Sequence, residues 1–180
     1  ERGDHRSRPK GRGARRLREN RNVTMPRRRF LDHRVPPPVV AGVVVLLMAL
    51  AERSSPHLSL EFPGRNALAW VLASAGMVIA VAGILSFRRL GTTVNPLKPH
   101  AATSLAVTGI YRRTRNPMYL GVTFILLGLG CGLGHPASIA LVALFPLFVQ
   151  RFQIEPEERA LAGLFGSAYD EYRAQVRRWL

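Results

Sequence analysis

The chain has 180 residues, 26 Lys and Arg against 11 Asp and Glu, and 47% hydrophobic residues, so it is both basic and apolar. The charge is uneven: residues 1–34 hold 13 basic and 4 acidic side chains, whereas residues 35–180 hold 13 and 7. The single cysteine, Cys131, excludes an internal disulfide and a CxxC-type zinc site. No HExxH or HxxxH pair is present either, so no metal is predicted.

Residues 1–34 form a basic tail that is expected to be disordered, because residues 1–24 contain Arg, Gly and Pro without apolar periodicity. One alternative is an arm that binds RNA. No aromatic side chain interrupts residues 1–24 to stack on bases, so no nucleic-acid partner is predicted. A further alternative is that Met25 is an ordinary start for a membrane protein, which leaves open whether residues 1–24 belong to it.

Long windows without Asp, Glu, Lys or Arg indicate the fold class. They cover residues 35–51, 66–87 and 116–150, and the last is interrupted by the turn residues 134–136. Because about 20 helical residues cross a hydrocarbon core of roughly 30 Å, the sequence predicts an all-α, polytopic membrane protein. About four spans are expected, near 36–51, 66–87, 117–134 and 137–151. The first and last are short, and each alone would equally fit a buried helix of a soluble protein.

The charges of the connections predict the orientation. Residues 88–115 carry six basic and no acidic side chains, the 52–65 connection has no net charge, and the 134–136 turn has no Lys or Arg. Basic loops stay on the cytoplasmic side of membrane proteins. Both termini are therefore expected in the cytoplasm.

Residues 155–179 predict a short pair of amphipathic helices on the inner membrane surface. Pro156 suits the start of the first helix and Gly166 its end, and Ser167 with Asp170 has the spacing of a capping pair for the second. The tyrosines of the second helix are interpreted as interfacial anchors, and its arginines are expected near anionic lipid. These residues are Tyr169, Tyr172, Arg173, Arg177 and Arg178.

Polar clusters flank the predicted third and fourth spans. Because these spans form a hairpin with a three-residue turn, their inner ends are neighbours, and such ends are the first candidates for function. We therefore expect three residues at the start of the third span to face two acids after the fourth across one pocket. They are Arg115, Asn116 and Tyr119 on one side, and Glu157 and Glu158 on the other.

Each of these residues also has a structural interpretation. Arg115 is equally typical of a basic membrane anchor, and Glu157 with Glu158 is typical of dipole partners at a helix start. Asn116 and Pro117 suit the cap and first residue of a helix. Two isolated histidines, His100 and His135, are expected to be solvated.

The lead-in to the third span reads Arg115-Asn116-Pro117-Met118-Tyr119-Leu120-Gly121, and Ile154, Glu157-Glu158, Leu161, Phe165-Gly166, Tyr169 and Tyr172 follow the hairpin. This pattern resembles the integral-membrane methyltransferases that include isoprenylcysteine carboxyl methyltransferase and the phospholipid amine methyltransferases. The resemblance covers roughly residues 86–180, and Gly91 to Pro96 is similar to the bacterial branch. Asn116 departs from the His of many members, and an Asn cannot act as a general base.

The resemblance implies that residues 35–180 form a membrane methyltransferase domain. It further implies that S-adenosylmethionine binds at the cytoplasmic ends of the helices. The implied acceptor is a lipophilic small molecule or a lipid-anchored substrate that enters from the surrounding membrane lipids. The predicted catalytic residues are Arg115 and Glu158. The predicted cofactor-binding residues are Arg115, Asn116, Pro117, Tyr119, Gly121, Glu157 and Glu158.

The chemistry of the residues is compatible with that cofactor. Arg115 can pair with its carboxylate, and the glutamates can accept from its ammonium or diol and oppose its sulfonium. Gly121, or Gly128 and Gly130, would let the adenosine approach a helix closely. Without a histidine base, the sequence favours an acceptor that is already a nucleophile, such as an isoprenylcysteine-like carboxylate.

Three different functions stay open. A phospholipid amine N-methyltransferase requires a base or a water relay, because the ammonium must first lose a proton. An NADPH-dependent sterol-type reductase would need groups for phosphates, which the two glutamates repel. A non-enzymatic membrane scaffold fits the charge pattern equally well.

Overall fold

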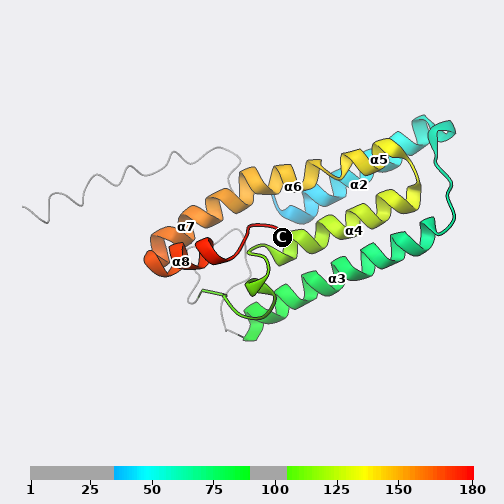
Figure 1. Ribbon diagram of the computed structural model, residues 1–180. Coiled ribbons are helices and arrows are strands. Elements are labelled where there is room, and N and C mark those ends of the chain that lie inside the picture. The colour runs from blue at the N-terminus through cyan, green and yellow to red at the C-terminus, as the bar shows by residue number, and fades with distance from the viewer. Residues whose placement is uncertain (1–34, 90–104) are drawn as a thin grey trace, which may run out of the picture.

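A computed structural model describes residues 35–89 and 105–180. The predicted disorder of residues 1–34, the family-like stretch at 91–96 and His100 lie outside the described residues. Within the described ranges every regular element is helical, and long helices lie side by side along one direction (Figure 1). The prediction of an all-α fold is confirmed.

The helices follow the predicted spans closely. The elements are α2 (Pro37–Ser54), the 3₁₀ turn η1 (Pro56–Leu58), α3 (Arg65–Arg89), the 3₁₀ turn η3 (Gly109–Arg112), α4 (Pro117–Leu133), α5 (Pro136–Leu141), α6 (Leu144–Val149), the π-helical turn η4 (Gln150–Ile154), α7 (Glu155–Phe165) and α8 (Ser167–Gln175). α4 contacts α3 on one side and α2, α5 and α6 on the other (Figure 1). α4 is thus the central helix of the bundle.

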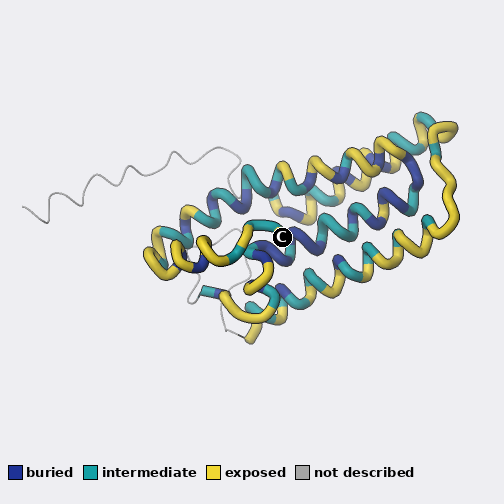
Figure 2. Tube along the Cα trace, in the orientation of Figure 1, coloured by how far each residue is buried: buried dark blue, intermediate teal, exposed yellow. Residues whose placement is uncertain are grey.

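Within residues 35–89 and 105–180, three helical runs are long and apolar enough to cross a membrane: α2 with 18 residues, α3 with 25, and the run Pro136–Phe165 with 30. α4 has 17 residues and spans about 26 Å at 1.5 Å per residue, slightly less than a hydrocarbon core. It is also the helix that its neighbours cover most, whereas much of α3 is exposed (Figure 2). The outward face of α3 is apolar, and its Trp70 is 74% exposed, as expected for a surface that meets lipid.

Small residues bring α3 and α4 into close contact. A Cβ atom added to Gly121 would lie 2.5 Å from the carbonyl oxygen of Gly76 and 2.7 Å from Cβ of Ala80. One added to Gly128 would lie 2.7 Å from the carbonyl oxygen of Ala69. The backbone of α3 therefore fills the space beside these glycines, as is typical of helix packing in membranes.

Gly130 packs in the same way against the other neighbours of α4. A Cβ atom there would lie 3.1 Å from Cε of Met48 in α2 and 3.3 Å from Cα of Ile139 in α5. The expected approach of adenosine to Gly121, Gly128 or Gly130 thus finds no space beside their α-carbons. Packing accounts for all three residues.

α7 begins at Glu155 and has Pro156 in its first turn, as predicted, but no non-helical residue separates it from the preceding part of the run Pro136–Phe165. α7 continues from η4, and Ile154 before it is already helical. A proline has no N–H and its ring crowds the carbonyl four residues earlier. The wider turn η4 directly precedes Pro156 and accommodates it, which keeps the run continuous.

Gly166 ends α7, as predicted, with a φ of 52° that favours glycine. The predicted capping pair is wrong. Gly166 itself is the N-cap of α8, and no side chain caps that helix. Ser167 is the first residue of α8 instead of its cap.

The apolar core lies between α2, α4 and the α5–α6 run, and contains Val44, Met48, Leu126, Phe145 and Val149. Its buried polar groups tie α2 to this run. Ser138 donates to the carbonyl of Met48 at 3.1 Å, and Nε2 of His135 lies 3.2 Å from the carbonyl oxygen of Ser55. His135 is only 2% exposed, so the prediction that it is solvated is wrong.

Candidate active site

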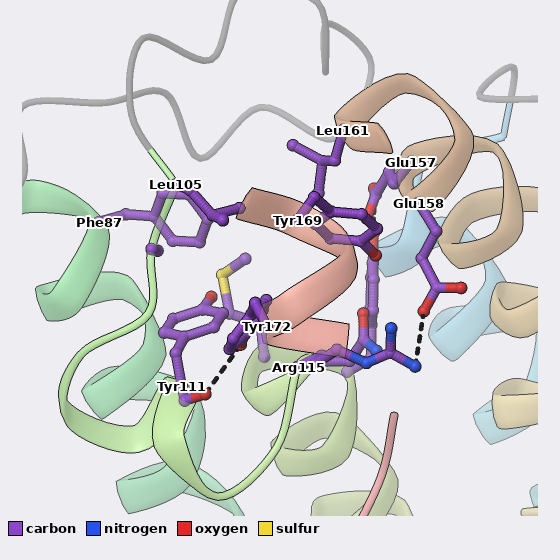
Figure 3. Close-up of a pocket in the computed structure, with 13 residues that line it drawn as sticks. Phe87, Leu105, Tyr111, Arg115, Glu157, Glu158, Leu161, Tyr169 and Tyr172 are labelled. Atoms are coloured by element: carbon purple, nitrogen blue, oxygen red, sulfur yellow. Dashed lines mark hydrogen bonds and ion pairs between the residues drawn. The ribbon is translucent and has the colours of Figure 1, made fainter. Parts of the chain in front are cut away.

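A pocket lies at the end of the bundle where α4 begins and where α7 and α8 meet (Figure 3). Side chains from α3, η3, α4, α7 and α8 line it, together with the residues that precede η3. The lining residues are Phe87, Leu105, Ala106, Tyr111, Arg115, Asn116, Met118, Tyr119, Glu157, Glu158, Leu161, Tyr169 and Tyr172.

The pocket brings together five of the seven predicted cofactor-binding residues. Tyr119 donates its hydroxyl to Oε1 of Glu157 at 2.9 Å, and Nη2 of Arg115 lies 3.3 Å from Oε1 of Glu158. The expectation that the start of the third span faces the two glutamates is therefore confirmed. The other two, Pro117 and Gly121, are buried in the bundle and do not line the pocket.

The two glutamates have different partners. Glu158 accepts two hydrogen bonds from Arg178, from Nε at 3.1 Å and from Nη2 at 2.7 Å, in addition to its contact with Arg115. Glu157 has only the hydroxyl of Tyr119, and no ion pair within the described ranges. Glu158 is therefore paired with two guanidinium groups, whereas Glu157 has no cationic partner among the described residues.

Arg115 keeps free donors although its side chain is only 11% exposed. Its Nε and Nη1 atoms are buried and have no hydrogen-bond partner in the part of the chain that the structure describes. Buried donors are normally paired, so such atoms in a pocket indicate a site for an acceptor. A planar guanidinium with two free donors suits a carboxylate.

Residues 176–180, here named the C-terminal strap, lie against the residues that lead into α4. The carbonyl of Arg177 accepts from the backbone N–H of Arg115 at 3.0 Å. The carbonyl of Arg178 accepts from the hydroxyl of Thr114 at 3.2 Å and from the side-chain amide of Asn116 at 3.0 Å. The strap therefore fastens the lead-in of α4 in place.

The strap corrects two predictions. The sequence predicts Arg178 near anionic lipid, but its guanidinium pairs with Glu158, and this pairing raises the pKa of Arg178. Asn116 occupies the N-cap position of α4, as predicted, yet its side chain donates to the strap and makes no cap hydrogen bond. The strap itself carries no pattern in the sequence that could have placed it here.

Besides Tyr119, three tyrosines line the pocket although the sequence does not predict them there: Tyr111, Tyr169 and Tyr172. Tyr169 and Tyr172 are 2% and 9% exposed, so their interpretation as interfacial anchors is wrong. Tyr172 donates to the carbonyl of Tyr111 at 2.8 Å, and the Tyr111 ring meets Phe87 edge-on at 5.2 Å (Figure 3). Burial raises the pKa of Tyr169 to about 12 and raises the pKa of the other two as well. All three are neutral hydroxyl groups at physiological pH.

Part of the pocket lining, here named the apolar wall, is apolar. It consists of Phe87, Leu105, Ala106, Met118 and Leu161. A charged wall and an apolar wall in one pocket can hold a polar ligand beside an apolar one. This arrangement suits a transfer between two molecules of different character.

The comparisons with known proteins identify the family of the chain. The family model for phospholipid methyltransferases matches residues 65–168, which include α3, α4 and the run that carries both glutamates. An uncharacterised protein of Haemophilus influenzae is 41% identical over 63 residues, which are 35% of this chain and all of that protein. No solved structure matches the chain. The match over more than half of the chain shows that it belongs to the isoprenylcysteine and phospholipid methyltransferase family of membrane proteins.

Proposed function

We propose that the protein transfers a methyl group from S-adenosylmethionine to a lipophilic acceptor held in the membrane. The observation that carries this proposal is that one pocket holds both Arg115, which has two buried free donors, and Glu157, which has no cationic partner among the described residues. The methyl donor is an amino acid with a sulfonium group, so it carries one carboxylate and two positive charges. The pocket offers complementary groups to both.

The roles follow from the partners of each residue. Arg115 would hold the carboxylate of the donor with Nε and Nη1. Glu157 would receive its ammonium, with the Tyr119 hydroxyl keeping the carboxylate in position. Glu158 would act on the donor only through Arg115, because Arg178 already occupies both of its oxygens. We therefore propose Glu157 as the primary acidic ligand.

Bound S-adenosylmethionine supplies the electrophilic methyl group. The residues of the chain need no covalent step for this reaction. They orient the donor and the acceptor in line and exclude water, which together provide most of the rate in such transfers. The buried tyrosines and the apolar wall support the exclusion of water from the pocket.

The acceptor is proposed to be a carboxylate or a similar nucleophile on an isoprenylcysteine-like or other lipophilic molecule. The apolar wall suits its hydrocarbon part. The described lining contains no His, Cys or Lys, and Asn116 donates to the strap, so neither it nor a histidine supplies a base. An ionised carboxylate needs no base.

The second candidate is a phospholipid amine N-methyltransferase. The family match favours it, and Glu157 is the one pocket acid without a cationic partner in the described ranges, so it could take a proton from an ammonium. Analysis of membrane lipids with and without the protein separates the two. The appearance of mono- and dimethylated ethanolamine headgroups would favour the phospholipid amine N-methyltransferase over methyl transfer to a carboxylate.

A sterol-type reductase and a membrane scaffold receive less support. The phosphates of NADPH would need several basic groups, and among the described lining residues only Arg115 is basic. A scaffold would have no use for the buried donors of Arg115 that have no partner.

We also propose that the pocket faces the cytoplasm. Exposed arginines lie at this end of the bundle, as the positive-inside rule requires. They are Arg88, Arg89, Arg112 and Arg113.

Binding of S-adenosylhomocysteine, the demethylated product, tests the proposal. Purified protein in detergent should bind it with micromolar affinity, and Arg115→Gln should weaken binding by at least about tenfold because a charged pair is lost. Arg113→Gln is the matched control, because Arg113 is exposed and does not line the pocket. Binding of NADPH instead, or no binding of either ligand, would contradict the proposed function.

A further inference from the structure

Arg178 of the C-terminal strap has no place in the roles above, yet it is the strongest partner of Glu158. Its guanidinium binds the carboxylate with two hydrogen bonds, at 3.1 and 2.7 Å. Arg115 reaches the same carboxylate with Nη2 alone, at 3.3 Å. The side chains of Glu158 and Arg115 are 13% and 11% exposed, whereas that of Arg178 is 31% exposed.

The two arginines compete for one carboxylate. A buried carboxylate binds a guanidinium best through two parallel hydrogen bonds. Because Arg178 already fills both oxygens of Glu158, Arg115 cannot form such a pair with it. Its Nε and Nη1 therefore stay without partners within the described ranges.

We propose that Arg178 is a positioning residue that occupies Glu158 and thereby leaves Arg115 free to bind an anionic ligand group. This inference rests on the proposed function, in which that group is the carboxylate of the methyl donor. It assigns a role to the strap beyond fastening the lead-in of α4. Without Arg178, the guanidinium of Arg115 turns onto Glu158 and its donors are consumed there.

Hydrogen bonds of the strap hold the backbone of Arg178 in place. The carbonyl of Arg178 is held by Thr114 and Asn116, on either side of Arg115, and the indole of Trp179 donates to Gln150 at 3.1 Å. The backbone of residue 178 is thus fixed on both sides of the pair that its side chain makes. Such fixed geometry is what a residue acting through others requires.

The test compares two ligands in four proteins. S-adenosylhomocysteine has the carboxylate, and its decarboxylated analogue keeps the amine and the adenosine. Arg178→Gln should weaken binding of S-adenosylhomocysteine by about tenfold or more and leave the analogue unchanged. Arg177→Gln, the adjacent exposed arginine of the strap, should behave like the unaltered protein with both ligands.

Removal of the second charge gives the decisive comparison. The double variant Glu158→Gln with Arg178→Gln should bind S-adenosylhomocysteine better than Arg178→Gln alone, because no carboxylate then captures Arg115. If the strap has only a structural role, Arg178→Gln would weaken the binding of both ligands equally, and the double variant would show no recovery. Either result would overturn the inference. If the unaltered protein binds neither ligand, the proposed function fails. If the unaltered protein binds S-adenosylhomocysteine and Arg178→Gln does not change this binding, this inference is rejected and the proposed function stands.

Discussion

Gly121→Ala should destabilise the protein through the contact between α3 and α4. The added Cβ would lie 2.5 Å from the carbonyl oxygen of Gly76 and 2.7 Å from the backbone N of Ala80, whereas ordinary contact begins at 3.4 Å. Two of the obstructing atoms belong to backbone, so no rotamer change relieves them. The helices must separate by up to 0.9 Å at this point. Overpacking of this kind costs about 1–3 kcal/mol of unfolding free energy.

Gly132→Ala is the matched control in the same helix. A Cβ there would lie 3.5 Å from Cβ of Ala69, which is an ordinary contact. Both substitutions gain the same helix propensity, up to about 1 kcal/mol, so their difference isolates the clash. Thermal unfolding in detergent and binding of S-adenosylhomocysteine should be measured on both proteins. Equal melting temperatures would refute the packing argument, and normal melting with lost binding would restore Gly121 as a cofactor residue.

Three further predictions concern the pocket. Glu157→Gln should weaken the binding of both S-adenosylmethionine and S-adenosylhomocysteine by at least about tenfold in titrations, because both ligands carry the ammonium. Glu155→Gln is the control, because Glu155 lies outside the pocket, and it should leave binding unchanged. Equal effects of the two substitutions would contradict the role of Glu157. Tyr172→Phe should lower the unfolding free energy by about 1 kcal/mol in thermal or chemical unfolding, because it loses the bond to the Tyr111 carbonyl. Since burial raises the pKa of Tyr169 from 10.0 to about 12, the unfolded chain loses this proton first, and stability should fall from pH 10 to 12. Melting curves of Tyr169→Phe should show a smaller fall, and an unchanged fall would refute that assignment.

The sequence predicts the spans well because their signal is local. Charge-free windows mark the helices to within a few residues, and the hairpin of α4 and the following run forces Arg115 and Tyr119 to meet the glutamates. Pro156 marks the start of α7 as predicted, but the helical run continues through it. The π-helical turn that accommodates this proline is not marked by any residue pattern.

The remaining errors concern contacts between residues distant in sequence. Whether Tyr169 lies at a lipid interface or in a pocket depends on where α8 packs, and no periodicity decides that. Arg178 resembles any surface arginine in the sequence, because its partner Glu158 lies 20 residues earlier. The two glutamates are equivalent in the sequence, and only their different partners distinguish Glu157 as the one without an arginine partner among the described residues.

The turn η4 determines how the site responds to the loss of one residue. A π-helical turn holds one residue more than an α-helical turn, so the deletion of one residue between 150 and 154 would restore a regular α-helix. The shorter turn would cover nearly the same rotation and rise, because five residues of a π-helix and four of an α-helix each complete slightly more than one turn. Glu157 and Glu158 would therefore keep their place in the pocket. The deletion of one residue within α6 would instead rotate everything after it by about 100° and shift it by about 1.5 Å, so that both glutamates would leave the pocket. η4 is thus a place where the chain can lose a residue without losing the site.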